Sequence, residues 1–174
     1  MTDLRIRPVG PPDIGAITRI YADAVIEGTA SFEIEPPDEA EMARRYEMLL
    51  AGGYPYVVAV IAGTVTGYAY AGAYRARPAY RWTVEDSVYV APEFHRQGIG
   101  SRLLESIIAE SEACGFRQMI AVIGDSAQVA SIALHKSAGF AMVGTLRSVG
   151  FKHGRWLDTP LMQRSLGESD TTAP

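Results

Sequence analysis

The chain has 174 residues, of which 48% are apolar and 21% are charged, and its formal net charge is −4. This length suits one domain with a single core, and the composition is that of an ordinary globular protein. An acidic balance excludes a global electrostatic field for nucleic acid, and no apolar run reaches the ~20 residues of a membrane span. We therefore expect no nucleic-acid and no membrane partner.

Two further features indicate a cytoplasmic protein. Cys114 is the single cysteine, so no disulfide can form within the chain, and a reducing compartment is expected. The first residues, MTDLRIRPVGPPD, contain no apolar segment typical of a secretory signal. Cys114 follows the apolar stripe of a helix, and we expect it to pack in the core without a catalytic role.

The first part of the chain predicts a strand, two helices and two strands. Residues 4–9 alternate apolar and polar side chains like a short strand, and residues 11–25 place apolar residues at helical spacing. Asp38 suits the N-cap of a second helix over 38–53. Residues 56–74 predict two strands joined at Gly63 and Thr64.

The second part continues the alternation of strands and helices. A basic, aromatic loop over 75–81 leads to a strand ended by Pro92, and a helix follows over 98–113. Residues 118–124 are almost wholly apolar, which predicts a central strand covered on both faces. A short helix ends at Gly139, two strands flank the turn KHGR, and residues 167–174 form a small polar tail that we expect to be disordered.

This order, β-α-α-β-β-β-α-β-α-β-β, contains no linker and no internal repeat. It predicts a single domain over residues 1–166 of α/β (α+β) class, with a mixed central sheet flanked by helices.

The glycines at the start of the third helix need an explanation, because glycine costs roughly 1 kcal/mol per helix position relative to alanine. Helix N-termini expose unpaired N–H groups that bind anions, and a glycine-rich entry lets a phosphate approach them. The segment RQGIGS has no Lys-Ser or Lys-Thr as a P-loop requires. Leu103 occupies the third glycine position of a dinucleotide fingerprint. A different phosphate-binding loop is therefore expected.

The segment HRQGIGSRLL resembles the acetyl-CoA-binding loop of the GNAT superfamily of N-acetyltransferases. The family pattern is Gln or Arg, two residues, Gly, one residue, then Gly or Ala. It fits with Arg96 leading at a spacing one residue shorter, or with His95 in the first place. The segments WTVEDSVYVAPEF, SIALHKSAGF and GFKHGRWLD are similar to the phosphinothricin and methionine sulfone/sulfoximine acetyltransferase branch. The resemblance runs from about Arg5 to Leu166.

The resemblance implies acetyl-CoA as co-substrate and no metal. Its pyrophosphate would lie on the loop, and its pantetheine arm would pair like an added strand with the preceding strand. The implied cofactor-binding residues are Val88, Tyr89, Val90, Arg96, Gln97, Gly98, Ile99, Gly100 and Ser101. Relatives carry an Asn before the next helix; here Gln128 stands at that position, which puts this contact in doubt, and Ser131 is a second candidate.

Acetyl transfer to an amine requires removal of a proton from the ammonium and charge relief at the leaving thiolate. Strand alternation places Glu85 on a polar face just before the loop, and the resemblance implies an acid there. His135 is the second catalytic candidate, because its ordinary pKa near 6.5 suits proton exchange. Which of the two is base and which is acid stays open. Asp86 interrupts the apolar face and is an alternative base or a structural acceptor.

Substrate binding is expected from Glu85 itself and from basic residues near it. Arginine grips a carboxylate with two hydrogen bonds, and the resemblance favours Arg75 and Arg77, with Lys152 near the C-terminus and Phe32 as an apolar wall. The resemblance thus implies acetylation of the α-amine of a small amino acid such as phosphinothricin, methionine sulfone or methionine sulfoximine.

Two other functions remain open, namely a protein or peptide N-terminal acetyltransferase and a non-catalytic acyl-CoA-binding domain. Glu85 and His135 beside the loop argue against the second. Relatives are commonly homodimers, and the apolar C-terminal strands would allow a dimer here.

Overall fold

A computed structural model describes residues 3–174 and contains one mixed seven-stranded sheet. The strands are β1 (Leu4–Pro8), β2 (Tyr56–Ile61), β3 (Thr64–Ala73), β4 (Thr83–Val90), β5 (Gln118–Val122), β6 (Ala141–Lys152) and β7 (Arg155–Ser165). The helices are α1 (Ile14–Glu27), α2 (Glu39–Ala51), α3 (Ile99–Ala113) and α4 (Val129–Ser137), with short 3₁₀ turns at Pro11–Asp13, Pro78–Tyr80 and Pro92–Phe94. The predicted fold class and element order are confirmed.

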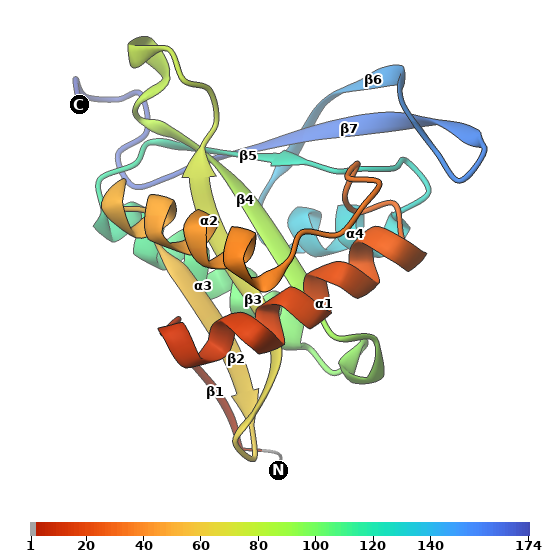
Figure 1. The fold of residues 1–174 in the computed structure, drawn as a ribbon. Coiled ribbons are helices and arrows are strands. Elements are labelled where there is room, and N and C mark those ends of the chain that lie inside the picture. Colours follow the sequence, from red (N-terminus) through yellow and green to blue (C-terminus); the bar gives the residue numbers. More distant parts are fainter. Residues whose placement is uncertain (1–2) are drawn as a thin grey trace.

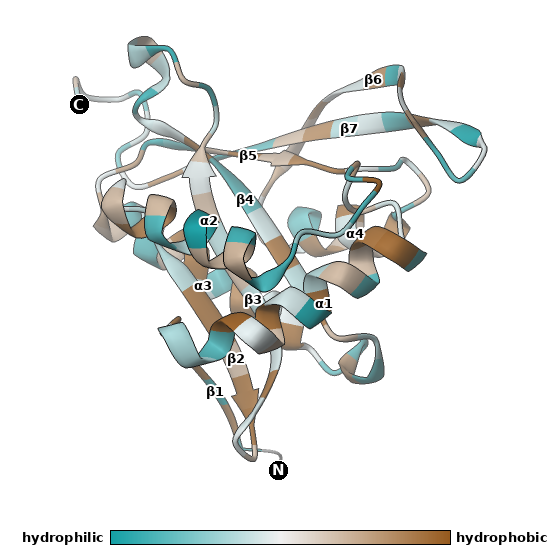
Figure 2. Ribbon diagram, in the orientation of Figure 1, coloured by the Kyte–Doolittle hydropathy of each residue, from teal (hydrophilic) through white to brown (hydrophobic). Residues whose placement is uncertain are grey.

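The sheet order is β1-β2-β3-β4-β5-β7-β6, and only β4 and β5 pair in parallel. Helices α1 and α2 cover one face, and α3 and α4 lie on the other (Figure 1). Each face buries its own core, because alternate residues of the central strands point to opposite sides. Ile17 and Val25 of α1 pack with Tyr68, whereas Leu103 and Ile107 of α3 pack with residues of the opposite face. The central strands β2 and β3 are accordingly mostly hydrophobic in Figure 2.

Several local predictions are confirmed by the structure. The Asp38 side chain accepts a hydrogen bond from the N–H of Glu41 and caps α2. The hairpin turn between β2 and β3 is present but lies one residue earlier than predicted, at Ala62 and Gly63, which both have positive φ, and Thr64 already belongs to β3. The turn within KHGR has the same feature at His153 and Gly154.

The prediction that β5 is covered on both faces is wrong. Met119 and Ala121 are buried on the side of α3, but Val122 on the other side is 38% exposed. Helix α1 packs on β3 and β4, and the face of β5 beyond them has no helix over it (Figure 1). The apolar side chains of β5 border cavities there.

The prediction for Cys114 is also wrong, because this residue is exposed. The chain leaves α3 here and turns at Gly115, which has a φ of 84°. Residues 167–170 form turns, and Ser169 accepts a hydrogen bond from the Gln118 side chain. The domain limit at residue 166 and the disorder of the tail stay predictions.

Candidate active site

The site begins where β4 and β5 separate. The two strands pair only at three positions, from Thr83 opposite Gln118 to Glu85 opposite Ile120, and β4 then continues without β5 to Val90. Beyond Glu85, the edge of β4 that faces β5 therefore has backbone groups with no strand partner. This divergence opens a gap in the middle of the sheet.

The register on β3 tells which backbone groups of β4 face this gap. The N–H of Ala91 donates to Thr66, and the carbonyl of Thr83 accepts from Tyr74, so odd-numbered residues of β4 bond to β3. The backbone of Val88 and Val90 therefore faces the gap, whereas that of Tyr89 faces β3. His95 Nε2 donates to the Val90 carbonyl at 2.9 Å, which leaves the Val88 groups and the Val90 N–H free.

The glycine loop leads directly from β4 into α3. Gly98 is the N-cap and has a left-handed φ of 78°, and Arg96 also has a positive φ of 58°. The first bond in this helix runs from the Arg102 N–H to the Gly98 carbonyl. The N–H groups from Gln97 to Ser101 therefore have no acceptor within residues 3–174 and are free to bind an anion.

The two glycines serve different needs. A Cβ at Gly98 would meet nothing within 4 Å, so this position is open and its glycine is required by φ. A Cβ at Gly100 would lie 3.5 Å from Leu134 of α4 and 3.9 Å from Val90. Both distances are ordinary van der Waals contacts, so an alanine fits at Gly100, whereas a larger branched side chain would press on α4 and β4.

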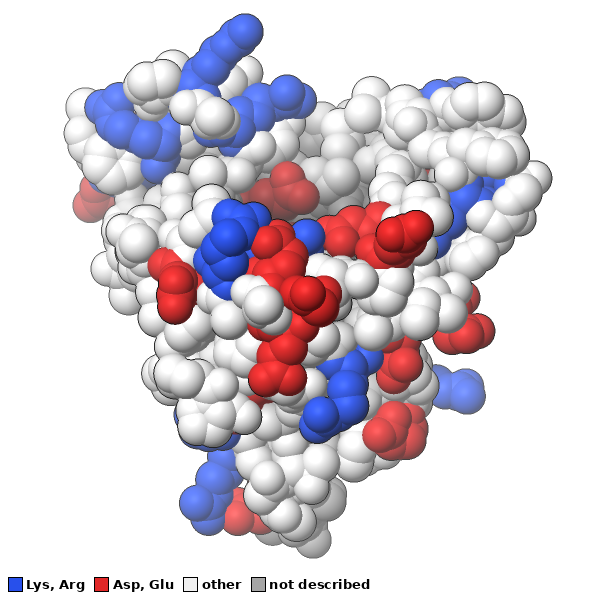
Figure 3. Space-filling view, in the orientation of Figure 1, with Lys and Arg blue, Asp and Glu red and all other residues white. Residues whose placement is uncertain are grey.

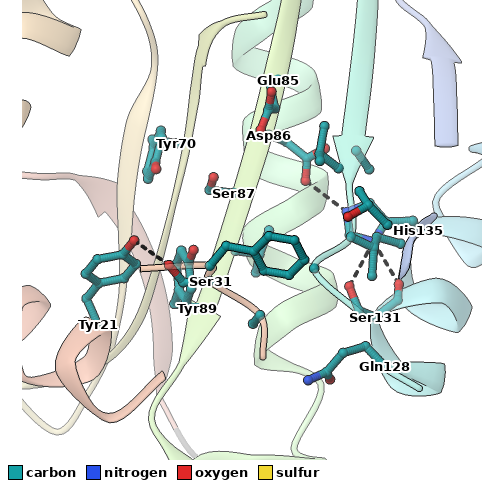
Figure 4. A pocket seen from close by; sticks show the side chains of 18 residues that line it. Tyr21, Ser31, Tyr70, Glu85, Asp86, Ser87, Tyr89, Gln128, Ser131 and His135 are labelled. Atoms are coloured by element: carbon teal, nitrogen blue, oxygen red, sulfur yellow. Dashed lines mark hydrogen bonds and ion pairs between the residues drawn. The ribbon is translucent and has the colours of Figure 1, made fainter. Parts of the chain in front are cut away.

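A cavity of about 340 Å³ occupies the gap between β4, β5 and α4. It contacts both faces of β4 because it passes through the divergence of the sheet. Tyr70, Ser87 and Tyr89 lie on one side of β4, and His135 lies on the other (Figure 4). Its lining consists of Tyr21, Ala30, Ser31, Phe32, Tyr70, Glu85, Asp86, Ser87, Val88, Tyr89, Ala121, Val122, Ile123, Gly124, Gln128, Ser131, His135 and Thr159.

Glu85 has the properties of a base that can act at neutral pH. Burial and, secondarily, the nearby charge of Asp86 raise the pKa of Glu85 to about 7, and Arg75 partly opposes this rise. Within residues 3–174 its carboxylate accepts no hydrogen bond, although it lines the cavity. The group is thus free to accept a proton from a ligand.

His135 is held at both ring nitrogens. Its Nδ1 lies 2.8 Å from the Ser131 carbonyl, and its Nε2 lies 2.9 Å from Asp86 Oδ2 (Figure 4). The side chains of His135 and Asp86 are 6% and 1% exposed. Burial lowers the pKa of His135. The hydrogen bond to Asp86, the charge of Asp86 and the hydrogen bond to the Ser131 carbonyl together outweigh burial, so that the pKa is raised overall. Asp86 is thus an acceptor for His135.

The start of α4 brings the remaining cofactor candidates to the cavity. Gln128 is the N-cap of α4, lines the cavity, and donates from Nε2 to the Thr29 hydroxyl at 3.2 Å. Ser131 follows one turn later and also lines the cavity. The amide of Gln128 is therefore shared with the loop after α1.

Apart from Glu85, the substrate candidates are four residues that fall into three places. Phe32 lines the cavity, and its ring lies so close to Gly150 that a Cβ there would meet it at 2.2 Å. Arg75 and Arg77 lie on the exposed loop before β4 and do not line the cavity, although Arg75 lowers the pKa of Glu85 by its charge. Lys152 is buried, and its Nζ donates to the Ser31 carbonyl at 2.8 Å.

Lys152 therefore does not line the cavity, although it is expected from the sequence to bind the substrate directly. It fixes the loop that carries Ser31 and Phe32, and its side chain is only 5% exposed. Basic side chains gather at the upper corner of the molecule that carries the loop before β4, whereas acidic ones gather over α1 and α2 (Figure 3).

The structure adds lining residues that sequence reasoning missed. Ser87 and Tyr70 are paired in the register of β4 and β3, and their side chains share the face of Glu85. Strand alternation could have found Ser87. Tyr21 and Ser31, whose hydroxyls are 2.9 Å apart, come from α1 and the loop after it, and no local pattern marks them.

The described part of the chain offers neither a metal centre nor a membrane-spanning helix. Among residues 3–174, no group of three or more His, Cys, Asp or Glu side chains could hold a metal ion. Over the same residues, no helix combines the length and the apolar character that a bilayer crossing requires.

Comparison with known proteins agrees with this geometry. Residues 6–161 match the family model described as an acetyltransferase (GNAT) domain. The chain is 53% identical to a phosphinothricin N-acetyltransferase of Alcaligenes faecalis, over 97% of this chain and 86% of that protein. It is 41% identical to an L-methionine sulfoximine/L-methionine sulfone acetyltransferase of Salmonella typhimurium, over 95% and 96% of the two chains.

A solved structure extends the match to three dimensions. A phosphinothricin acetyltransferase from Sinorhizobium meliloti, in complex with AcCoA, superimposes with a TM-score of 0.97 at 51% identity, covering 100% of this chain and 94% of that one. The match spans the divergence of β4 and β5, the glycine loop and α4. The chain therefore belongs to the GNAT acetyltransferase family.

Proposed function

We propose that this N-acetyltransferase moves the acetyl group of acetyl-CoA to the α-amine of a small amino acid with a polar, tetrahedral phosphorus or sulfur group. Phosphinothricin, methionine sulfone and methionine sulfoximine are the expected acceptors, because similar proteins are named for them. The observation that carries the proposal is Glu85, an unpartnered carboxylate with a pKa of about 7 in the cavity where β4 and β5 diverge.

The free backbone groups of the site fit acetyl-CoA. The N–H groups of the loop from Gln97 to Ser101 suit its pyrophosphate, and the side chain of Arg96 adds a cation. The free groups of Val88 and Val90 suit the amides of its pantetheine arm, which would then extend the sheet at the gap. Ile99 and Gly100 would contribute through their backbone N–H groups, since the Ile99 side chain is buried in the core. Ser131 lines the cavity, and Gln128 offers an amide if its bond to Thr29 opens.

The residues divide the chemistry between the two sides of β4. Acetyl-CoA supplies an activated thioester. Glu85 accepts a proton from the substrate ammonium, and the neutral amine then attacks the thioester carbon while the carbon–sulfur bond breaks. The nitrogen then loses its second proton, which the leaving thiolate takes up, so that the N-acetyl amino acid and the thiol of CoA are formed. His135, held as a cation, offsets the negative charge that develops on sulfur. This assigns Glu85 as the base and His135 as the charge-relieving group.

Substrate selection would combine an apolar wall and a cation. Phe32 forms part of the cavity wall, and Tyr21, Tyr70 and Ser87 add hydroxyl groups. We place the substrate carboxylate toward Arg75, whose charge already reaches Glu85. Arg77 lies farther along the same loop, and Lys152 contributes by fixing the loop of Phe32.

We further propose a cytoplasmic homodimer. The single cysteine is consistent with a reducing compartment. Strand β6 is an edge of the sheet and exposes Met142, Val143, Leu146, Val149 and Phe151, each at least 50% exposed. An exposed apolar edge strand is typical of an interaction surface.

The test is a thiol-release assay of the purified chain with acetyl-CoA and three acceptors: methionine sulfone, its carboxamide and a short peptide. We expect methionine sulfone to be acetylated, and the carboxamide to lose at least tenfold in kcat/KM. In Arg75→Ala most of that difference should vanish. Equal turnover of acid and carboxamide, or preference for the peptide, would reject the amino-acid assignment; no thiol release with any amine would reject catalysis.

A further inference from the structure

Asp86 stands out among the lining residues because nothing in the proposed chemistry uses it directly. Its side chain is 1% exposed, and Oδ1 is shielded from solvent without a hydrogen-bond partner. A buried carboxylate with an unsatisfied oxygen is costly to stability. The other oxygen, Oδ2, is 2.9 Å from His135 Nε2. The hydrogen bond to His135 is therefore the interaction that compensates for burying this carboxylate.

The hydrogen bonds of His135 define where its protons lie. The Ser131 carbonyl can only accept, so Nδ1 carries a proton. An ionised carboxylate can also only accept, so Nε2 donates its own proton to Asp86. The ring is then a doubly protonated imidazolium. Phe140 packs edge-on against it, with ring centres 5.1 Å apart, and limits its rotation.

Among the described residues, few other charged groups lie near the Asp86–His135 pair. The cavity lining carries one glutamate, one aspartate and one histidine, namely Glu85 and Asp86 on β4 and His135 on α4. Its other titratable side chains are the phenols Tyr21, Tyr70 and Tyr89. Its residues from β5, from the loop after β5 and from β7 are uncharged, and Arg75 acts from the loop before β4. Because Asp86 pairs with His135, Glu85 is the carboxylate left free for the substrate proton.

We propose that Asp86 is a positioning residue of the acetyl transfer, which holds His135 through Nε2 so that the ring stays cationic and fixed at the cavity wall. This inference rests on the proposed function, in which His135 relieves charge on the leaving sulfur. Asp86 also ties β4 to α4 across the gap, and α4 carries Gln128 and Ser131. Against the effect of burial, the hydrogen bond and charge of Asp86 help to raise the pKa of His135, which favours the same cationic ring.

The first test reads His135 without using activity. The chain has three histidines, so ¹⁵N-labelled imidazoles can be titrated individually by NMR. We expect wild-type His135 to be doubly protonated at pH 7 and to titrate above its ordinary pKa. In Asp86→Asn it should be a neutral imidazole at pH 7. Asp23→Asn, which removes the same charge from an exposed site on α1, should leave the titration unchanged.

The second test asks whether Asp86 acts through His135. Asp86→Asn should lower kcat by roughly 10- to 100-fold and change the KM for acetyl-CoA by less than about threefold. Adding Asp86→Asn to His135→Gln should lower kcat little further than His135→Gln alone, because the two residues act as a unit.

The outcomes separate this inference from the proposed function. A wild-type His135 that is neutral at pH 7, a titration unchanged in Asp86→Asn, or multiplicative losses in the double variant would overturn the inference while acetylation persists. Absence of acetylation by the wild type would instead overturn the proposed function, and the NMR titration would still decide the Asp86–His135 contact.

Discussion

Glu85 and Asp86 are consecutive acids on one strand, yet they meet opposite surroundings. Asp86 shares its face with the buried Val84 and finds a partner in His135, whereas Glu85 faces the cavity without one. An unpartnered, partly buried carboxylate is easier to protonate, which explains the raised pKa of Glu85. Adjacent residues thus provide a proton acceptor and a counter-charge because a strand alternates its side chains.

The raised pKa of Glu85 has a measurable cost in stability. Its pKa rises from 4.5 to about 7 on folding, so ionising it in the folded state is unfavourable. The cost is small below the unfolded value, grows as pH rises from 4.5 to 7, and is complete above 7. Glu85→Gln should therefore increase the free energy of unfolding at pH 8 by on the order of 1 to 3 kcal/mol.

Urea unfolding at pH 8 and pH 5 measures this effect. The gain from Glu85→Gln should shrink at pH 5, where the wild-type carboxyl is already protonated in the folded state. A variant that is less stable than wild type at pH 8 would show that Glu85 makes a stabilising interaction and is not the unpartnered base described above.

Among the elements, the start of α3 and the end of β4 define the cofactor path. Both depend on backbone groups left free, by the divergence of β4 from β5 and by the missing first-turn acceptors of α3. Gly100 lies at this junction, where a Cβ would already contact Leu134 and Val90 at van der Waals distance and leave no room for a larger side chain.

Gly100→Val is expected to weaken acetyl-CoA binding at least tenfold, about 1.4 kcal/mol. A Cβ alone fits beside Leu134 at 3.5 Å, but the branches of valine would displace α4 or the loop. Gly100→Ala is the matched control and should bind nearly as wild type. Calorimetry on the folded variants measures both affinities, and an unchanged affinity in Gly100→Val would contradict the role of this junction.

At the scale of the molecule, the sequence predicts the order of the helices and strands better than it predicts which of their surfaces are buried. Hydrophobic periodicity and turn residues placed the helices and strands, and the loop pattern placed Gly98 and Gly100 at a helix start. The cover over β5 was not predictable, because it depends on how far α1 and α2 reach across the sheet. The buried hydrogen bond of Lys152 was not predictable either, because its partner Ser31 is distant in sequence and accepts only through its backbone carbonyl.

The proposed dimer can be tested on the apolar surface of β6. Leu146 is 50% exposed on this edge strand, and a charge there would oppose its burial against a second copy. Leu146→Glu should shift the chain from dimer to monomer in analytical ultracentrifugation without loss of folded structure. Thr64→Glu, at an exposed site of β3 distant from β6, is the control. A wild-type chain that sediments as a monomer at micromolar concentration would refute the dimer.

The most direct test of the account is the pH dependence of kcat/KM for acetyl transfer to methionine sulfone, measured side by side on the wild type and Glu85→Gln. The wild-type value should rise with pH through a midpoint near 7, because Glu85 must be ionised to accept the proton. Glu85→Gln should be 10²- to 10⁴-fold slower at pH 8 and should lack this limb. A variant that keeps the limb, or stays within about threefold of the wild type, would contradict the assignment of Glu85 as the base.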